Sequence, residues 1–180
     1  AVSPINNDVV WSTGNSNVYR SIDQGSTWTT FASNISGIQM ITADIRRVDR
    51  VWIGTYNAGI KRIDHDGIKS ISVNEGILKF DNQFPSTIEA IEQNPDNPNH
   101  MLVGGRNVIT GGKSTGLFES YDGGNSFEVI PAMPSVRDIW CLKFDPHGKR
   151  AFLSTSQGTL VYEYENYKLW KESTDIFSIR

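Results

Sequence analysis

Residues 19–30 read Y-R-S-I-D-Q-G-S-T-W-T-T, and residues 118–130 read F-E-S-Y-D-G-G-N-S-F-E-V-I. The two stretches share the pattern Ser-x-Asp-x-Gly-x-x-aromatic, at Ser21, Asp23, Gly25 and Trp28 and again at Ser120, Asp122, Gly124 and Phe127. The Asp side chain in such a pattern can accept hydrogen bonds from backbone N–H groups of its own turn. The glycine can adopt a positive φ without steric cost, and the aromatic side chain can pack back over the turn. Each copy therefore predicts a strand, a tight turn and a return strand.

Further strand-like segments recur around these two turns. Short apolar runs that end in small residues occupy positions 10–14, 51–55, 101–105 and 151–155. Other predicted strands precede them, at 38–44, 88–95 and 139–146. The acidic position of the turn recurs at Asp23, Asp64, Asp122 and Glu165. Because these positions are roughly 40–60 residues apart, close to the size of one four-stranded unit, the chain is predicted to contain four repeats.

The shared turn pattern resembles the Asp-box, or BNR repeat, of sialidase-like, sortilin-like and xyloglucanase-like β-propellers. Residues 50–64 resemble the repeat of two-component-regulator propellers. The resemblance implies an all-β fold, a single β-propeller region of four blade-like, four-stranded antiparallel repeats. The predicted repeats cover about 1–36, 37–86, 87–135 and 136–174, with 175–180 as the first strand of a further blade or of the first. We expect a section of a larger propeller; the alternative is a closed ring of four blades.

The composition is that of an ordinary globular chain, with 38% hydrophobic and 21% charged residues and a net charge of −3. Because the charges of both signs are interspersed, nucleic acid is not an expected partner. No apolar run approaches the length of a membrane span, so membrane insertion is not expected either. The family resemblance implies an exported protein (periplasmic, cell-surface or secreted), with further blades or domains of the parent chain as partners.

The residue types that carry metal or redox chemistry are sparse. Cys141 is the single cysteine and lies in an apolar run, which predicts a buried, inert thiol. Neither a disulfide nor a cysteine zinc site can be built from it, and the three histidines fall in separate turns. We therefore expect no metal and no cofactor. The five tryptophans, Trp11, Trp28, Trp52, Trp140 and Trp170, are predicted to lie in the core between blades.

In propellers of these families, ligands bind mostly on the face that carries the connections between blades and between the second and third strands of a blade. The Asp-box is a structural turn that lies away from this face. Two of the ligand-face connections are long, 74–86 and 104–116, and both flank the third repeat. Long connections on a rigid scaffold often carry function. The predicted ligand-binding residues are Tyr56, Asn57, Lys79, Asp81, Gln83, Arg106, Asn107 and Lys113.

Two functions remain open from the sequence. The first is a non-catalytic recognition scaffold of an exported protein, which binds a glycan or a protein partner on the propeller face. The alternative is a fragment of a glycoside hydrolase of the sialidase or xyloglucanase type. Such an enzyme needs two facing carboxyl groups, and the candidates on the ligand face are Glu75, Asp81, Asp138 and Asp175. No catalytic pair among them is singled out by the sequence.

Overall fold

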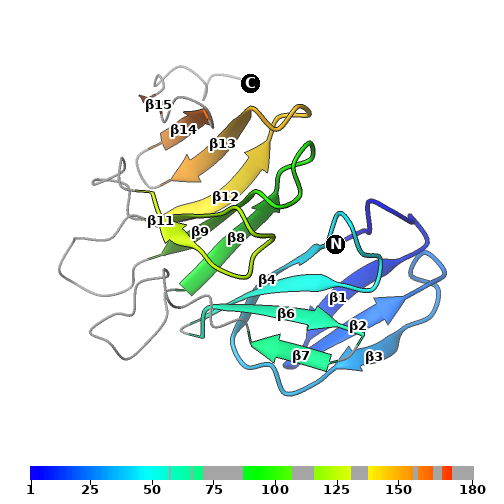
Figure 1. The fold of residues 1–180 in the computed structure, drawn as a ribbon. Helices are drawn as coiled ribbons and strands as arrows, with labels where there is room; N and C mark the ends of the chain where they lie inside the picture. Colours follow the sequence, from blue (N-terminus) through cyan, green and yellow to red (C-terminus); the bar gives the residue numbers. More distant parts are fainter. Residues whose placement is uncertain are drawn as a thin grey trace, which may run out of the picture.

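The computed structural model describes residues 1–56, 58–65, 67–70, 87–106, 116–130, 138–155, 158–163 and 168–171. The regular secondary structure of these residues is β-strand throughout, which confirms the predicted all-β fold. The strands form four antiparallel sheets, and in each sheet they lie side by side in chain order (Figure 1). Within the described part of the chain, no helix has the length and apolar character of a membrane span.

We call the sheets blades 1 to 4 and their strands a to d. Blade 1 holds strands b to d: β1 (Val10–Gly14), β2 (Asn17–Ser21) and β3 (Thr29–Ala32). Blade 2 holds β4 (Ile38–Ala43), β5 (Val51–Thr55), β6 (Ile60–Asp64) and β7 (Gly67–Ser70). Blade 3 holds β8 (Thr87–Gln93), β9 (Met101–Arg106), β10 (Leu117–Ser120) and β11 (Glu128–Val129). Blade 4 holds β12 (Ile139–Phe144), β13 (Arg150–Thr155), β14 (Gly158–Glu163) and β15 (Lys168–Lys171).

The first residues of the chain take the strand-a position of blade 1. Val2 bridges to Val10 in the antiparallel sense. The backbone N–H of Trp11 donates to the carbonyl of Ala1 at 2.7 Å, and that of Ser3 donates to Val9 at 2.9 Å. Residues 1–3 therefore pair with β1 as the end of a strand a would.

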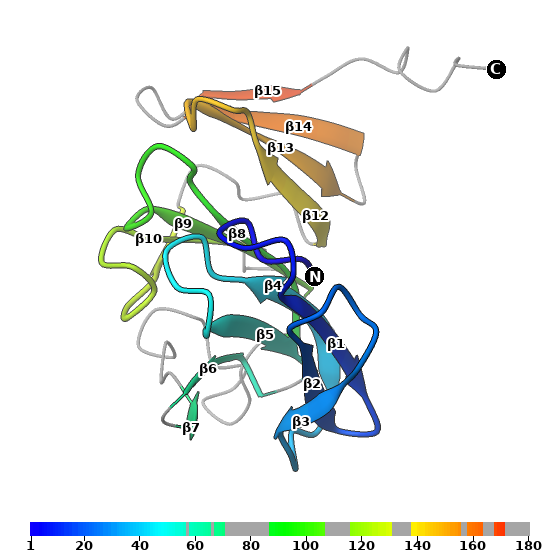
Figure 2. The same ribbon diagram turned by 90° about the vertical axis from the view of Figure 1, so that its right-hand side faces the viewer.

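Successive blades stack on one another, as Figure 2 shows, and an apolar cluster fills each of the three interfaces. Between blades 1 and 2 it includes Trp11, Val18, Ile35, Val51 and Ile53. Between blades 2 and 3 it includes Trp52, Ile60, Ile88, Met101 and Phe127. Between blades 3 and 4 it includes Leu102, Leu117, Ile139, Ala151 and Leu153.

One residue of each strand b anchors its blade to the next. In each blade, the last residue of strand a pairs with a residue near the start of strand b, and the anchor is the next residue of strand b. The four anchor residues are Trp11, Trp52, Leu102 and Phe152. The first three are 1%, 0% and 0% exposed, whereas Phe152 is 43% exposed. Among the described residues no blade covers the outer face of blade 4, which agrees with a run of blades rather than with a closed ring of four.

The residue two positions after the anchor sets how closely the next blade approaches. A β-carbon on Gly54 would lie 2.5 Å from the carbonyl oxygen of Ile88, and one on Gly104 would lie 2.5 Å from Cγ2 of Ile139. Glycine is thus required where blades 2, 3 and 4 meet. Thr13 holds this position in blade 1, where β1 contacts β4 less extensively than β5 contacts β8.

A buried polar network joins blades 3 and 4. His100 Nε2 lies 2.7 Å from Glu119 Oε1, and the Tyr162 hydroxyl donates to the same oxygen at 2.7 Å. Asn94 Nδ2 lies 2.9 Å from His100 Nδ1 and donates to the carbonyl of Gly148 in blade 4 at 2.7 Å. The network satisfies polar groups that would be costly to bury alone.

Each a–b turn is capped by one side-chain oxygen at the same place. Asp44 Oδ1 accepts from the backbone N–H groups two and three residues ahead, at 2.8 and 3.0 Å. Asn94 Oδ1 does the same at 2.9 and 3.2 Å, and Ser3 Oγ at 3.3 and 3.4 Å. In blade 4, Asp145 Oδ1 accepts from the N–H of Lys149 at 2.9 Å. These caps are Asx-type and Ser-type turns.

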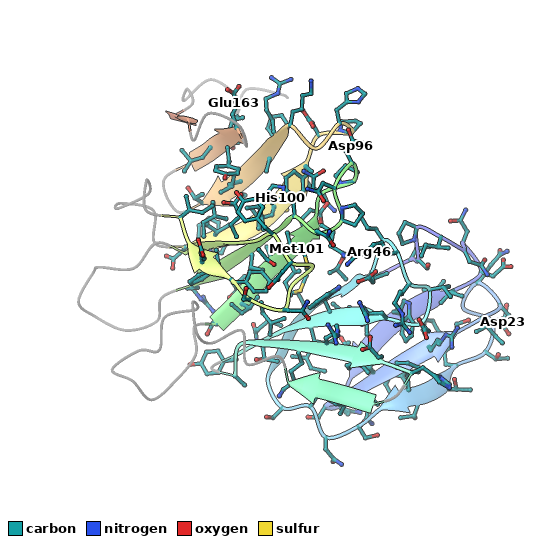
Figure 3. All side chains as sticks on the ribbon, viewed as in Figure 1. Asp23, Arg46, Asp96, His100, Met101 and Glu163 are labelled. Carbon is teal, nitrogen blue, oxygen red and sulfur yellow. The ribbon has the colours of Figure 1, made fainter. Side chains whose placement is uncertain are left out.

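Equivalent hydrogen bonds hold the two turns that carry the Ser-x-Asp-x-Gly pattern. Ser21 Oγ donates to Asp23 Oδ1 at 2.7 Å and accepts from the N–H of Gly25 at 2.8 Å, while Thr27 donates from its backbone and hydroxyl to Asp23 at 2.8 and 2.6 Å. In blade 3 the corresponding distances among Ser120, Asp122, Gly124 and Ser126 are 2.8, 2.9, 2.9 and 2.6 Å. Figure 3 shows Asp23 on the same side of the molecule as the a–b turn residues Arg46 and Asp96.

The hydrogen bonds of these turns lower the pKa of both carboxyl groups. The Thr27 hydroxyl, followed by that of Ser21, lowers the pKa of Asp23 to about 2. Burial raises the pKa of Asp122, but hydrogen bonds from Ser126, Ser120 and Asn125 outweigh it and bring the pKa below its ordinary value. Both side chains therefore favour the ionised form as acceptors.

The turn of blade 2 differs from the sequence expectation. Asp64 was aligned with Asp23, but it lies within the β6–β7 ladder, where it pairs with Gly67. It is buried and bound by the guanidinium groups of Arg50 and Arg62. The alignment failed because β6 and β7 join through a tighter hairpin than the turns at Asp23 and Asp122.

Three side chains expected in the core are instead exposed. Trp28 and Trp140 are 42% and 48% exposed, and Cys141, predicted to be buried, is exposed as well. Trp11 and Trp52 do lie in the core, and Trp170 lies in a strand whose side chains are outside the described residues. Trp28 in blade 1 and Cys141 in blade 4 lie on faces that no described blade covers. Trp140 lies at a bulge in strand a of blade 4.

We predict that the turn at Asp122 contributes to stability and not to ligand binding. Asp122→Ala removes the acceptor of the Ser120, Asn125 and Ser126 hydrogen bonds, so the free energy of unfolding should fall by about 1–2 kcal/mol. Urea denaturation measures this change, and Glu128→Ala, at an exposed acidic residue of the same blade, is the control. Loss of ligand affinity at unchanged stability would contradict the prediction.

Candidate functional site

The same irregularity occurs near the start of strand a in blades 2, 3 and 4. The pairing register shifts between Ile38 and Met40, between Ile88 and Ala90, and between Ile139 and Cys141. The unpaired residues at these bulges are Gln39, Glu89 and Trp140. A bulge re-aims the side chain of its extra residue, and here it leaves Trp140 48% exposed.

The end of strand b brings two predicted site residues to the same end of the blades. Tyr56 follows β5, its backbone N–H donates to Gly37 O at 2.6 Å, and its side chain is 44% exposed. Arg106 takes the equivalent position in blade 3 and bridges to Asp138, just before β12. Its Nη2 lies 3.0 Å from Glu89 Oε1, while its Nε is buried without a hydrogen-bond partner in the described part of the chain.

Close packing of the blades places these side chains along one rim. Gly54 in β5 lies directly against Ile88, so Tyr56 follows beside the start of β8, where Glu89 lies. Gly104 lies against Ile139 in the same way, so Arg106 lies beside the start of β12 and bridges to Asp138, two residues before Trp140. We call Tyr56, Glu89, Arg106 and Trp140 the rim cluster. It combines two exposed aromatic rings with an Arg–Glu ion pair.

The rim cluster contains two of the residues that the sequence predicted to bind a ligand. Tyr56 and Arg106 were predicted, whereas Asn57, Lys79, Asp81, Gln83, Asn107 and Lys113 lie outside the described residues. Glu89 and Trp140 were missed because a bulge leaves no mark in a pattern of apolar residues. One sequence signal could have located both residues, because each directly follows the first isoleucine of its strand a.

The attachment points of the two long connections can be placed. The segment before Thr87 and the segment after Arg106 leave from the same end of blade 3, because Thr87 and Arg106 are partners in the β8–β9 ladder. The N–H of Gly105 donates to the carbonyl of Gly116 at 2.6 Å, so the second segment returns to the same end. That both segments converge on a ligand stays a prediction.

Comparisons with known proteins identify the architecture. No protein-family model matches the chain, and no curated protein sequence is similar to it. Among solved structures, the chain is similar to a GH74 enzyme from Niastella koreensis, with a TM-score of 0.68 and 12% identity over 94% of this chain and 29% of that one. It is also similar to the extracellular domain of a putative hybrid two-component system from B. thetaiotaomicron, with a TM-score of 0.66 and 18% identity over 95% of this chain and 22% of that one.

A third similar structure is an auxiliary nutrient-binding protein from Bacteroides thetaiotaomicron, with a TM-score of 0.63 and 14% identity over 94% of this chain and 39% of that one. The chain folds as consecutive blades of a β-propeller. At these identities the likeness shows the fold alone. The chain spans less than two fifths of the length of each of the three.

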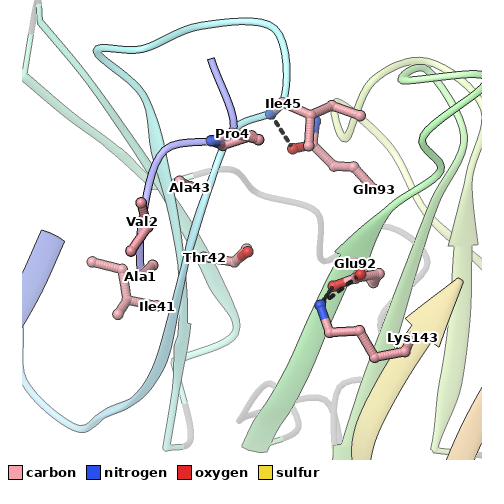
Figure 4. A pocket seen from close by; sticks show the side chains of 10 residues that line it. All are labelled: Ala1, Val2, Pro4, Ile41, Thr42, Ala43, Ile45, Glu92, Gln93 and Lys143. Atoms are coloured by element: carbon pink, nitrogen blue, oxygen red, sulfur yellow. Dashed lines mark hydrogen bonds and ion pairs between the residues drawn. The ribbon is translucent and has the colours of Figure 1, made fainter. Parts of the chain in front are cut away.

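The strands a of the propeller line a cavity of about 430 Å³, seen from close by in Figure 4. Ala1, Thr42, Glu92 and Lys143 hold equivalent positions in the four blades, and all four line it. Lys143 Nζ donates to both oxygens of Glu92 at 2.7 and 2.9 Å. Burial raises the pKa of Glu92, against the opposing effect of Lys143. The cavity lies toward the a–b turns, whereas the rim cluster lies at the other end of the same strands.

Metal chemistry finds no support in the described ranges. No group of three or more His, Cys, Asp or Glu side chains there could hold a metal ion.

Proposed function

We propose that the chain is part of an exported, non-catalytic recognition propeller that binds a glycan through the rim cluster. The observation that carries the proposal is the bulge that exposes Trp140, two residues after Asp138, to which the ion-paired Arg106 is bridged. An aromatic face packs against the apolar face of a sugar ring, and Arg and Glu can hydrogen-bond its hydroxyl groups. A protein partner is the alternative ligand class.

The similar structures support this proposal in a general way. They include GH74 enzymes, extracellular domains of putative two-component systems and a nutrient-binding protein. Several of these are extracellular by description, which favours an exported protein here. We further propose that Lys79, Asp81, Gln83, Asn107 and Lys113, together with Asn57, extend the site from the two long connections.

A glycoside hydrolase fragment is the second candidate. Arg106 is ion-paired with Glu89 and bridged through its backbone to Asp138, so two carboxyl-bearing residues from adjacent blades flank it. Glycosidases use two carboxyl groups across the scissile bond. Release of reducing sugar from a bound oligosaccharide, and its loss in Glu89→Gln, would favour this candidate over simple recognition.

We predict that Trp140→Ala weakens glycan binding about tenfold, equal to ~1.4 kcal/mol, because the exposed ring is lost as a stacking surface. A glycan array identifies the oligosaccharide, and isothermal titration measures its Kd. Trp28→Ala is the matched control, since Trp28 is also exposed but lies beside the turn at Asp23, on the opposite face. Equal affinity of the wild type and Trp140→Ala would refute the proposed site, as would the absence of any glycan ligand.

A further inference from the structure

Strand c carries a charged side chain at the same position in blades 1, 2 and 3. The residue that pairs with the anchor of strand b is Arg20 in blade 1, Arg62 in blade 2 and Glu119 in blade 3. Residues directly opposite each other in an antiparallel pair point to the same face of the sheet, so each of these side chains faces the following blade as its anchor does. The position therefore brings one charge to each of the three interfaces between described blades.

In blades 2 and 3 this charge has polar partners. Arg62 Nε donates to Asp64 Oδ2 at 3.2 Å, and its Nη1 donates to Asn125 of blade 3 at 3.3 Å. Glu119 Oε1 lies 2.7 Å from His100 Nε2. Such partners offset the cost of removing a charge from water.

Arg20 of blade 1 has no such partner among the described residues. Its Nε is buried without a hydrogen-bond partner, and its guanidinium group forms no ion pair there. The group lies over two aromatic rings instead, with Cζ 5.4 Å from the ring centre of Trp11 and 5.9 Å from that of Phe31. Trp11 is 1% exposed, and its Nε1 is a second buried donor without an acceptor. Two neighbouring donors at this interface thus lack acceptors within the described ranges.

Blade 2 shows which kind of acceptor suits these donors. The equivalent indole nitrogen, Trp52 Nε1, donates to Asp44 Oδ2 at 2.9 Å, and the equivalent guanidinium group, that of Arg62, is bound by Asp64. The guanidinium group of Arg50 contacts both aspartates, so the two acceptors lie close together. Both acceptors are carboxylates.

Blade 1 lacks these carboxylates. Ser3 caps the a–b turn in place of Asp44, and Ile22 follows the arginine by two residues in place of Asp64. The serine oxygen reaches one bond less far from the backbone than an aspartate oxygen, and it accepts N–H groups of its own turn. The Ile22 side chain is 67% exposed, so a ligand can displace it without loss of core packing.

We propose that the interface of blades 1 and 2 contains a binding site for the carboxylate group of a small organic acid, held by Arg20 and Trp11. A guanidinium group binds a carboxylate through charge-assisted hydrogen bonds in a planar geometry. The aromatic rings against Arg20 keep water from one side of it, which strengthens these bonds. The site lies near the turn at Asp23 (Figure 3), at the opposite end of the blades from the rim cluster. It is therefore separate from the proposed glycan site.

Titration with sodium acetate, followed by the indole N–H signals in a ¹H–¹⁵N spectrum, tests the site. The chain has five tryptophans, and Trp11→Phe identifies the signal of Trp11. We expect this signal to shift and to saturate with acetate at constant pH and ionic strength, and to stay in place with sodium chloride. A signal that acetate does not move up to about 100 mM, or that chloride moves equally, would overturn the proposal.

Ile22→Asp is the decisive variant, because it supplies beside Arg20 the carboxylate that Asp64 supplies in blade 2. Ile22 is exposed, so the variant should fold, and its own carboxylate should abolish acetate binding. Arg20→Gln should weaken acetate binding at least about tenfold, since the charge is lost. Phe152→Asp, at an exposed residue of blade 4, adds the same charge elsewhere and should bind acetate like the wild type. Unchanged acetate binding in Ile22→Asp would place the carboxylate at another site, against the proposal.

Discussion

Replacing His100 by leucine is expected to lower the free energy of unfolding by about 3–5 kcal/mol, the usual cost of leaving a buried charge, here the Glu119 carboxylate, without its partner. His100 is 0% exposed and Glu119 is 4% exposed. The substitution would leave the Tyr162 hydroxyl as the donor that this network still offers to the Glu119 carboxylate. A buried acceptor without its donor keeps the full desolvation cost.

The protonation of His100 follows from its neighbours. Asn94 Oδ1 accepts two backbone N–H groups, at 2.9 and 3.2 Å, so its amide nitrogen must face the imidazole. Nδ1 of His100 therefore accepts from Asn94, and Nε2 carries the hydrogen that is donated to Glu119. Leucine cannot make either bond.

Chemical denaturation of His100→Leu measures the loss, and Tyr162→Phe is the graded control. The phenylalanine keeps the ring in the core and removes one hydrogen bond, so it should cost about 1 kcal/mol. A His100→Leu protein within about 1 kcal/mol of the wild type would show that the network adds little to the contact of blades 3 and 4.

Gly54→Ala is expected to cost about 3 kcal/mol, the upper part of the range for overpacking a core. The new β-carbon would lie 2.5 Å from the carbonyl oxygen of Ile88 and 2.8 Å from Cγ of Met40. Because the first of these atoms belongs to the backbone of the next blade, a side-chain rotation cannot relieve the overlap. Blades 2 and 3 would have to separate.

Gly14→Ala is the matched control for this substitution. Gly14 is also in a strand b, but the nearest atom to its added β-carbon is Cε2 of Tyr19 at 3.8 Å, an ordinary contact. The alanine should leave stability unchanged or raise it by about 0.4–1 kcal/mol, through the lower entropy of the unfolded chain. Thermal or urea unfolding of the two variants separates the effect of blade spacing from that of a lost glycine.

The fold was largely predictable because it repeats. The small-residue endings of the strands at 51–55 and 101–105 marked β5 and β9, and Gly54 and Gly104 prove to be the points of closest blade contact. The turns at Asp23 and Asp122 could also be predicted from the sequence. Their serine and aspartate side chains accept N–H groups of the same turn, so these residues must be spaced alike along the chain in both copies. Asp64 was wrongly aligned with Asp23 because it follows Asp23 by about one repeat length in the sequence, although it lies within the β6–β7 ladder.

The site was less predictable, for physical reasons. A bulge depends on pairing with a neighbouring strand, so nothing local showed that Trp140 would point outward. The exposure of Trp28 and Cys141 depends on which blades surround them, and a residue pattern within one repeat carries no information on that. His100 and Glu119 are 19 residues apart, and their contact with Tyr162 follows from the stacking of two blades.

The capped a–b turns carry a consequence for how such a chain can arise and be recognised. Ser3, Asp44 and Asn94 differ in charge and size, yet each places one oxygen over the backbone N–H groups two and three residues ahead, and Asp145 caps its own turn from the same position of the blade. Duplicated units can therefore drift in residue identity while the accepting atom stays in place. A search for related repeats should therefore score whether a short side chain with an oxygen acceptor occupies this position. It should not require one particular amino acid there. Units too diverged for sequence alignment would then remain detectable as copies of one ancestor.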